Sequence, residues 1–101
     1  MTYLTDDKQV FLLTFTGFRL PVTSFLDTRP EVLNWFLILE NAILVVSRED
    51  ASTLAHLVHQ QFPGRWILVT EVAPDPHKTN GWMNQKVWEF INNPKSSGRW
   101  E

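Results

Sequence analysis

The sequence predicts an α+β fold, and three observations lead to this prediction. The chain has 101 residues, enough for one domain and too few for two. Short apolar runs typical of strands alternate with segments that have helical periodicity, and turn or capping residues separate them. Hydrophobic residues make up 44% of the chain, with five Trp and seven Phe, so a single domain of this size can bury its own core.

The chain begins with a strand and a short helix. Val10 to Phe15 is apolar on both faces, which is typical of a central strand, and Gly17 to Pro21 is predicted as a turn. Thr28 to Glu31 has the spacing of a capping box with proline in the first turn, and it predicts a helix that runs to about Trp35. An earlier start of this helix near Ser24 is the alternative, since proline is tolerated in a first turn.

The next segment is too apolar for a surface helix and is predicted as a hairpin. Its strands are expected at Trp35 to Leu39 and at Ala42 to Ser47. Glu40-Asn41 is the predicted turn, because Asn tolerates the positive φ that a tight hairpin needs. One long strand with a bulge is the alternative.

A helix, a strand and a second helix follow. Ser47 to Asp50 is a capping pattern that begins a helix with regular apolar spacing, which ends at about Phe62 before Pro-Gly. Arg65 to Val72 is bulky and β-branched and predicts a strand. Ala73 to Gly81 is predicted as a loop because of its two prolines, and Asn84 is expected to cap a last helix through Asn92.

This order of elements predicts a ferredoxin-like βαββαβ antiparallel sheet with an additional C-terminal helix. We expect residues 1–94 to form one domain and residues 95–101 to form a loose tail. Two helices on one face of the sheet leave the other face open. Since the strands are apolar on both sides, the terminal helix is expected to cover part of that face and a second copy of the chain the rest.

Charge and composition exclude several classes of function. The net charge of −2 gives no general basic field for nucleic acid. The chain has no cysteine, and therefore no disulfide framework, thiolate nucleophile or Cys-based zinc site. The first ten residues lack the pattern of a signal peptide, and no run approaches the length that spans a bilayer, so a cytoplasmic protein without membrane contact is expected.

Three stretches carry a resemblance to a known group of proteins. They are LNWFLILENAILVVS (33–47), REDASTLAHLVHQQFPGRWILVTEV (48–72) and GWMNQKVWEFINNP (81–94). They resemble the second strand and hairpin, the second helix and fourth strand, and the closing Trp-rich segment of small ferredoxin-like proteins related to the CRISPR-associated spacer-acquisition subunit. The third stretch is similar to an uncharacterised branch of that group.

The resemblance implies a homodimer built sheet to sheet. Nuclease members of the group carry an Asp at the end of the first strand, and the pair of subunits binds a divalent metal there. This sequence has Thr14, Phe15, Thr16 and Gly17 at that position, and none of them supplies a carboxylate ligand for a hard cation. The departure favours a non-enzymatic relative without a metal or another cofactor over a metal-dependent nuclease.

Other candidates for metal or acid–base chemistry are weak. His56 and His59 lie three residues apart on a predicted helix, but they point away from its apolar face and are expected to be exposed. Asp75 and His77 share a loop without a third ligand. Glu71 lies near the end of a strand, where an edge carboxylate is the ordinary interpretation.

The aromatic residues point to association with another protein. Trp next to Arg or Met is typical of interface hot spots, and the residues that we expect to bind a partner are Trp66, Trp82 and Trp88, with Phe11 and Phe15 under the sheet. The alternative is that the three tryptophans form a small cluster that holds the last helix. We therefore predict a homodimeric protein-interaction module, of the kind found among phage or bacterial accessory factors.

A nucleic-acid-binding or nuclease relative is the second hypothesis. Arg19, Arg48 and Arg65 would contact phosphate, and Glu71 or Asp75 would hold a metal. The acidic net charge argues against it, because neutralising phosphate supplies most of such affinity.

Overall fold

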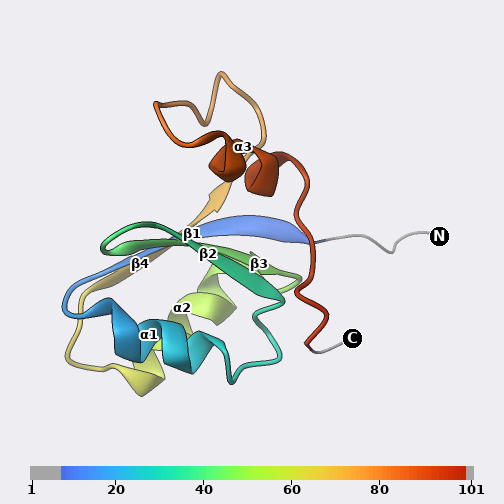
Figure 1. The fold of residues 1–101 in the computed structure, drawn as a ribbon. Coiled ribbons are helices and arrows are strands. Elements are labelled where there is room, and N and C mark those ends of the chain that lie inside the picture. The colour runs from blue at the N-terminus through green and yellow to red at the C-terminus, as the bar shows by residue number, and fades with distance from the viewer. Residues whose placement is uncertain (1–7, 100–101) are drawn as a thin grey trace.

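The structure is a computed structural model that describes residues 8–99. It is a small α+β fold with four strands and three helices in this described range (Figure 1). The elements are β1 (Gln9–Phe15), α1 (Arg19–Leu26), β2 (Asn34–Leu39), β3 (Ala42–Ser47), α2 (Ala51–Gln61), β4 (Ile67–Val72) and α3 (Gln85–Asn92).

The four strands form one antiparallel sheet in the order β2-β3-β1-β4. The first strand is therefore central, as its two-sided apolar sequence predicts, and β2 and β4 are the edges. The hairpin prediction is also correct: β2 and β3 pair around Glu40-Asn41, and a bulge lies between Leu37 and Leu39. The alternative of one long strand is excluded.

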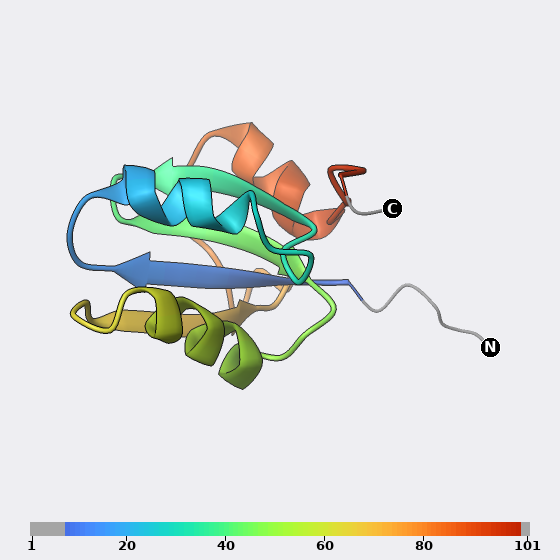
Figure 2. The same ribbon diagram turned by 90° about the horizontal axis from the view of Figure 1, so that it is seen from below.

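One face of the sheet is closed by α1 and α2, which lie side by side against it (Figures 1 and 2). Alternate residues of the strands point to this side and pack with the apolar faces of both helices. The buried cluster consists of Phe11, Leu13, Phe15, Val22, Leu26, Val32, Ile43, Val45, Leu54 and Val58. It is the larger of two clusters and the main core of the domain.

The other face carries α3 alone (Figure 1). Val87 and Ile91 of α3 are buried with Val10, Leu44 and Val46 of the sheet. The prediction that the terminal helix covers part of this face is therefore confirmed. Whether a second copy covers the rest stays a prediction.

The first helix lies earlier in the chain than the capping box suggests. It begins at Arg19, so Gly17 to Pro21 is a turn only up to Phe18, and Pro21 sits in the first turn of the helix. The Thr28 side chain donates instead to the carbonyl of Phe25 after the helix has ended. The prediction of a helix from Thr28 to Trp35 was wrong, because burial of Val22 and Leu26 in the core decided the position of the helix, not the local capping pattern.

The third helix has the predicted cap, whereas the second is capped by the last residue of the Ser47 to Asp50 pattern, because Ser47 lies in β3. The Asp50 side chain accepts a hydrogen bond from the Thr53 amide, and the Asn84 side chain accepts one from the Lys86 amide. No helix in residues 8–99 has both the length and the apolarity needed to cross a membrane.

Residues 95–99 contact the rest of the domain, and the loose tail expected for residues 95–101 stays a prediction. The Ser97 amide donates to the carbonyl of Leu33, and Asn34 donates through its side chain to the carbonyl of Lys95. Arg99 forms an ion pair with Asp27 in which the nitrogen and oxygen are 2.7 Å apart. These contacts hold residues 95–99 against the start of β2 and the end of α1.

Candidate interaction surface

Exposed apolar side chains gather at one end of the sheet. Among the described residues, the large hydrophobic side chains that are exposed are Phe18, Leu20, Leu39, Trp66, Leu68 and Trp82. All but Trp82 lie where β1 ends, where the β2–β3 hairpin turns and where β4 begins, and these connections meet at the same end of the molecule (Figure 2). We call these five residues the Trp66 surface.

The backbone beneath the Trp66 surface is fixed by hydrogen bonds between segments far apart in the sequence. Thr16 and Trp66 are joined twice: the Thr16 amide donates to the Trp66 carbonyl, and the Trp66 amide donates to the Thr16 hydroxyl. Asn41 of the hairpin donates through its side chain to the carbonyl of Gly17 at 2.7 Å. The exposed side chains therefore stand on a well-connected base, which lowers the entropy cost of binding.

Arg65 has a structural role at this end. Its guanidinium donates to the carbonyls of Thr16 and Phe18 and lies 4.9 Å above the centre of the Phe62 ring. Gly17 allows this approach, because it has a φ of 89° and a Cβ there would come within 3.1 Å of the guanidinium. The end of the first strand thus carries an arginine held by two backbone carbonyls and an aromatic ring.

A shallow hollow lies beside Trp66 on the side of the sheet that α3 leaves open. The strand register places Leu39, Ala42, Thr14 and Leu68 in one row across the sheet. Leu39 and Leu68 are 59% and 64% exposed at the two ends of the row, and Trp66 adjoins it with 84% exposed. The hollow has a volume of about 480 Å³ and is mostly apolar, which is typical of an association surface.

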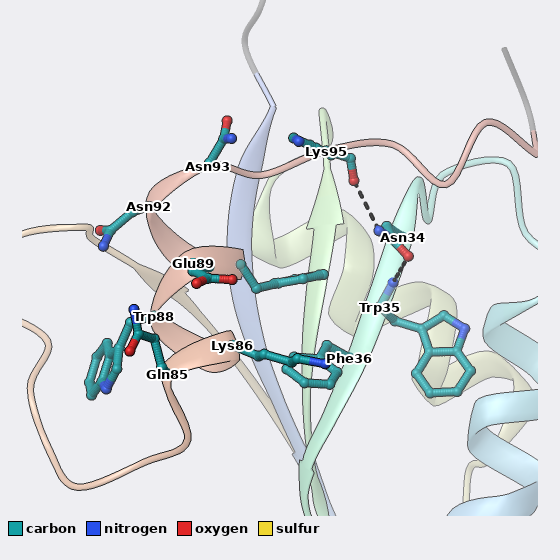
Figure 3. A pocket seen from close by; sticks show the side chains of 11 residues that line it. Asn34, Trp35, Phe36, Gln85, Lys86, Trp88, Glu89, Asn92, Asn93 and Lys95 are labelled. Carbon is teal, nitrogen blue, oxygen red and sulfur yellow. Dashed lines mark hydrogen bonds between the residues drawn. The ribbon is translucent and has the colours of Figure 1, made fainter.

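A larger open groove of about 790 Å³ runs between α3 and β2 (Figure 3). Phe36 and Phe90 line it with ring centres 5.5 Å apart, and the Trp88 side chain points away from β2. Its rim is made of amides and single charges, among them Asn34, which bonds to Lys95 across one end. Among residues 8–99, Glu89 is the only carboxylate that lines it, so this part of the chain offers the groove no pair of acids for general acid–base catalysis.

The residues that we predicted to bind a partner differ in their exposure to solvent. Trp66 and Trp82 are 84% and 98% exposed, whereas Trp88 is half-buried against the α3 side of the sheet. The alternative of one tryptophan cluster is therefore wrong. Phe11 and Phe15 are 1% and 6% exposed in the core between the sheet and the two helices, so they offer no surface to a partner.

The three arginines of the nucleic-acid hypothesis do not converge. Arg19 and Arg65 lie at the end of the sheet where β1 finishes, but Arg48 follows Ser47, which pairs with Gln9 at the opposite end. The guanidinium of Arg65 is already engaged by two carbonyls. A continuous track for phosphates is therefore not formed by this set.

The candidate metal ligands also stay apart. Within residues 8–99 there is no group of three His, Cys, Asp or Glu side chains that could hold a metal ion. His56 contacts the Ser52 carbonyl through Nδ1, and Asp75 accepts a hydrogen bond from the His77 amide within a turn. His59 and Glu71 are exposed. These contacts are ordinary surface and turn interactions.

Four members of the Trp66 surface were missed by sequence reasoning. Phe18 and Leu20 lie within the predicted turn from Gly17 to Pro21, Leu39 precedes the predicted turn at Glu40-Asn41, and Leu68 lies on a predicted strand. Large apolar residues next to turn residues were the available signal, because such positions rarely reach a core.

Comparison with known proteins gives no match: no family model, no curated protein and no solved structure matches the chain. The resemblance to the CRISPR-associated spacer-acquisition subunit therefore stays a hypothesis that no comparison supports.

Proposed function

We propose that the chain is a non-enzymatic protein-interaction module that forms a homodimer through the Trp66 surface. The observation that carries this proposal is the gathering of Phe18, Leu20, Leu39, Trp66 and Leu68 at one end of the sheet. Exposed apolar patches on small proteins usually mark association sites, and a tryptophan on a rigid base is a typical hot spot. The fixed backbone at Thr16, Gly17 and Arg65 supplies that base.

At the level of the fold, we propose the ferredoxin-like class. An antiparallel sheet in the order β2-β3-β1-β4, with a helix between β1 and β2 and another between β3 and β4, supports it as two split βαβ units. The apolar row that α3 leaves open supports a second copy as the partner, since the two-sided apolar strands otherwise lack a cover there.

Light scattering on a size-exclusion column tests the dimer, with the wild-type chain at high micromolar concentration. We expect a dimer for the wild type, and a monomer for the double variant Trp66→Ser/Leu68→Ser, whose side chains are mostly exposed in one copy. Each change should weaken association by roughly tenfold or more, as hot-spot residues do.

Trp82→Ser is the matched control, because Trp82 is as exposed but lies outside the surface. It should leave the dimer intact. Circular dichroism checks that all variants fold. A wild-type chain that is monomeric at high micromolar concentration, or a dimer that only Trp82→Ser disrupts, would overturn the proposal.

A further inference from the structure

The two edges of the sheet differ in how they are protected. At β2 the Asn34 side chain accepts a hydrogen bond from the Trp35 amide, a bulge interrupts the strand, and Lys95 and Ser97 bond to its beginning. Bulges and covering segments are devices that prevent an edge from pairing with another chain.

Strand β4 has none of these devices. Its register with β1 is continuous from Ile67 to Val72, and within residues 8–99 no strand pairs with its outer side. It contains no proline and no lysine, and Glu71 is its only charged residue. An edge of this kind is a template for pairing with another strand.

The direction of the free backbone groups follows from the contacts of Trp66. Its amide and carbonyl both bond to Thr16, so they point toward β1. Backbone groups alternate along an antiparallel strand, and those of Leu68, Thr70 and Val72 therefore point the same way. The amides and carbonyls of Ile67, Val69 and Glu71 point outward.

We propose that the partner of this edge is the β4 strand of a second copy, paired antiparallel about a two-fold axis at Val69. This inference rests on the proposed function: it uses Trp66 and Leu68 of the Trp66 surface and assigns the backbone contacts of the dimer to the β4 edge. In this register Val69 faces Val69 of the other copy and Ile67 faces Glu71, so every outward backbone group of β4 finds a partner. The strand is complementary to itself, as a two-fold interface requires.

The side chains also favour this register. On the face that carries α3, Leu68 comes to lie opposite Thr70 and Trp66 opposite Val72, which gives the exposed indole an apolar neighbour. A two-fold axis at Glu71 would place two like charges opposite each other and leave Ile67 unpaired. The axis at Val69 keeps the two carboxylates apart.

Disulfide trapping tests the register directly, because the natural chain has no cysteine. Leu68 and Thr70 of opposite copies form a non-hydrogen-bonded pair, whose Cα atoms lie about 4.5 Å apart and within reach of a disulfide. Leu68→Cys chains mixed with Thr70→Cys chains should form a covalent heterodimer under mild oxidation. Each variant alone should cross-link at least about fivefold less, since identical positions are then diagonal neighbours about 7–8 Å apart.

Ser52→Cys on α2 controls for random oxidation, because Ser52 is exposed and lies outside the strand. A second test removes one outward amide: Glu71→Pro should raise the dimer dissociation constant at least about tenfold, whereas Glu71→Ala should leave it unchanged or lower it. Proline is tolerated at such an outward position, and circular dichroism checks the fold.

The outcomes separate the two proposals. A dimer that shows the Leu68–Thr70 cross-link and is lost in Glu71→Pro supports the β4 edge. A dimer that depends on Trp66 but shows no preference for the mixed cysteine pair overturns the edge and leaves the Trp66 surface standing. A monomeric wild type overturns both, even if an added extended peptide binds.

Discussion

The two faces of the sheet are built differently. On one face, α1, α2 and the connection between α1 and β2 cover a cluster of ten buried side chains that includes Phe11, Val22 and Leu54. On the other, α3 seals a cluster of six and leaves the row from Leu39 to Leu68 open. Burial of apolar area is the dominant stabilising term, so the first face supplies most of the stability. The second is the face left available for contact with another chain.

The largest loss of stability is expected when a side chain is removed from the face covered by α1 and α2. Phe11→Ala should lower the free energy of unfolding by about 3–5 kcal/mol, because it deletes a ring that is 1% exposed and leaves a cavity. Urea unfolding measures the change. Leu68→Ala on the open face is the control, because that side chain is 64% exposed. It should change the free energy of unfolding of the monomer by less than about 0.5 kcal/mol.

A smaller effect is expected where α3 meets the sheet. Ile91→Ala removes a side chain that is 5% exposed from the smaller cluster and should cost about 2 kcal/mol. Hydrogen exchange should show the loss of protection concentrated in α3. A loss spread evenly over α1 and α2 would contradict the view that the two faces are separate layers.

At the end of the sheet that carries the Trp66 surface, Gly17→Ala should lower the free energy of unfolding by about 1 kcal/mol. The φ of Gly17 is 89°, and an added Cβ would meet the Arg65 guanidinium. Gly64→Ala is a matched control in the neighbouring turn, since a Cβ there meets no atom within 4 Å. Thermal unfolding compares the two variants. Equal stability of both would mean that the turn does not depend on glycine.

The smallest effect concerns Asp27 and pH. Hydrogen bonds from the Trp35 indole and then from Arg99 hold the pKa of its carboxyl below the usual value. A carboxyl with a lower pKa in the folded state stabilises the fold above its unfolded pKa, and this contribution is lost as the pH falls below about 4. The Asp27 side chain is 43% exposed, so solvent screens its charge. We therefore expect it to contribute only about 0.5 kcal/mol to the free energy of unfolding.

Asp27→Asn checks this expectation. The variant should be slightly less stable than the wild type at neutral pH, and the difference should shrink in acid as the pH falls through the lowered pKa of the folded carboxyl. Urea unfolding at both pH values measures it. A difference that persists in acid would show that packing, and not charge, is responsible.

Sequence reasoning located the elements whose signals are local. The Asn41 turn, the Asn84 cap and the apolar run of β1 each carry their own chemistry, and the structure places them as predicted. The Thr28 to Glu31 pattern failed because a capping box is worth less than burial of Val22 and Leu26.

The surface was only partly predictable. Trp66, Trp82 and Trp88 were all predicted to bind a partner, and Trp66 and Trp82 are exposed. Nothing local distinguishes Trp88, which is half-buried, from them. The role of Arg65 depends on the carbonyls of Thr16 and Phe18, nearly fifty residues away in sequence, and no short-range pattern encodes such a contact.

The contacts of residues 95–99 determine the order in which this end of the domain would detach under a pulling force. From α3 on one side of the sheet, the chain passes the start of β2, and Arg99 reaches Asp27 on the other side (Figure 1). A pulling force on this end meets the Arg99–Asp27 ion pair first, then the bond from Ser97 to Leu33, then the bond from Asn34 to Lys95, and only then α3. Because these contacts are loaded one after another, the segment should peel away at low force while the four-stranded sheet still resists.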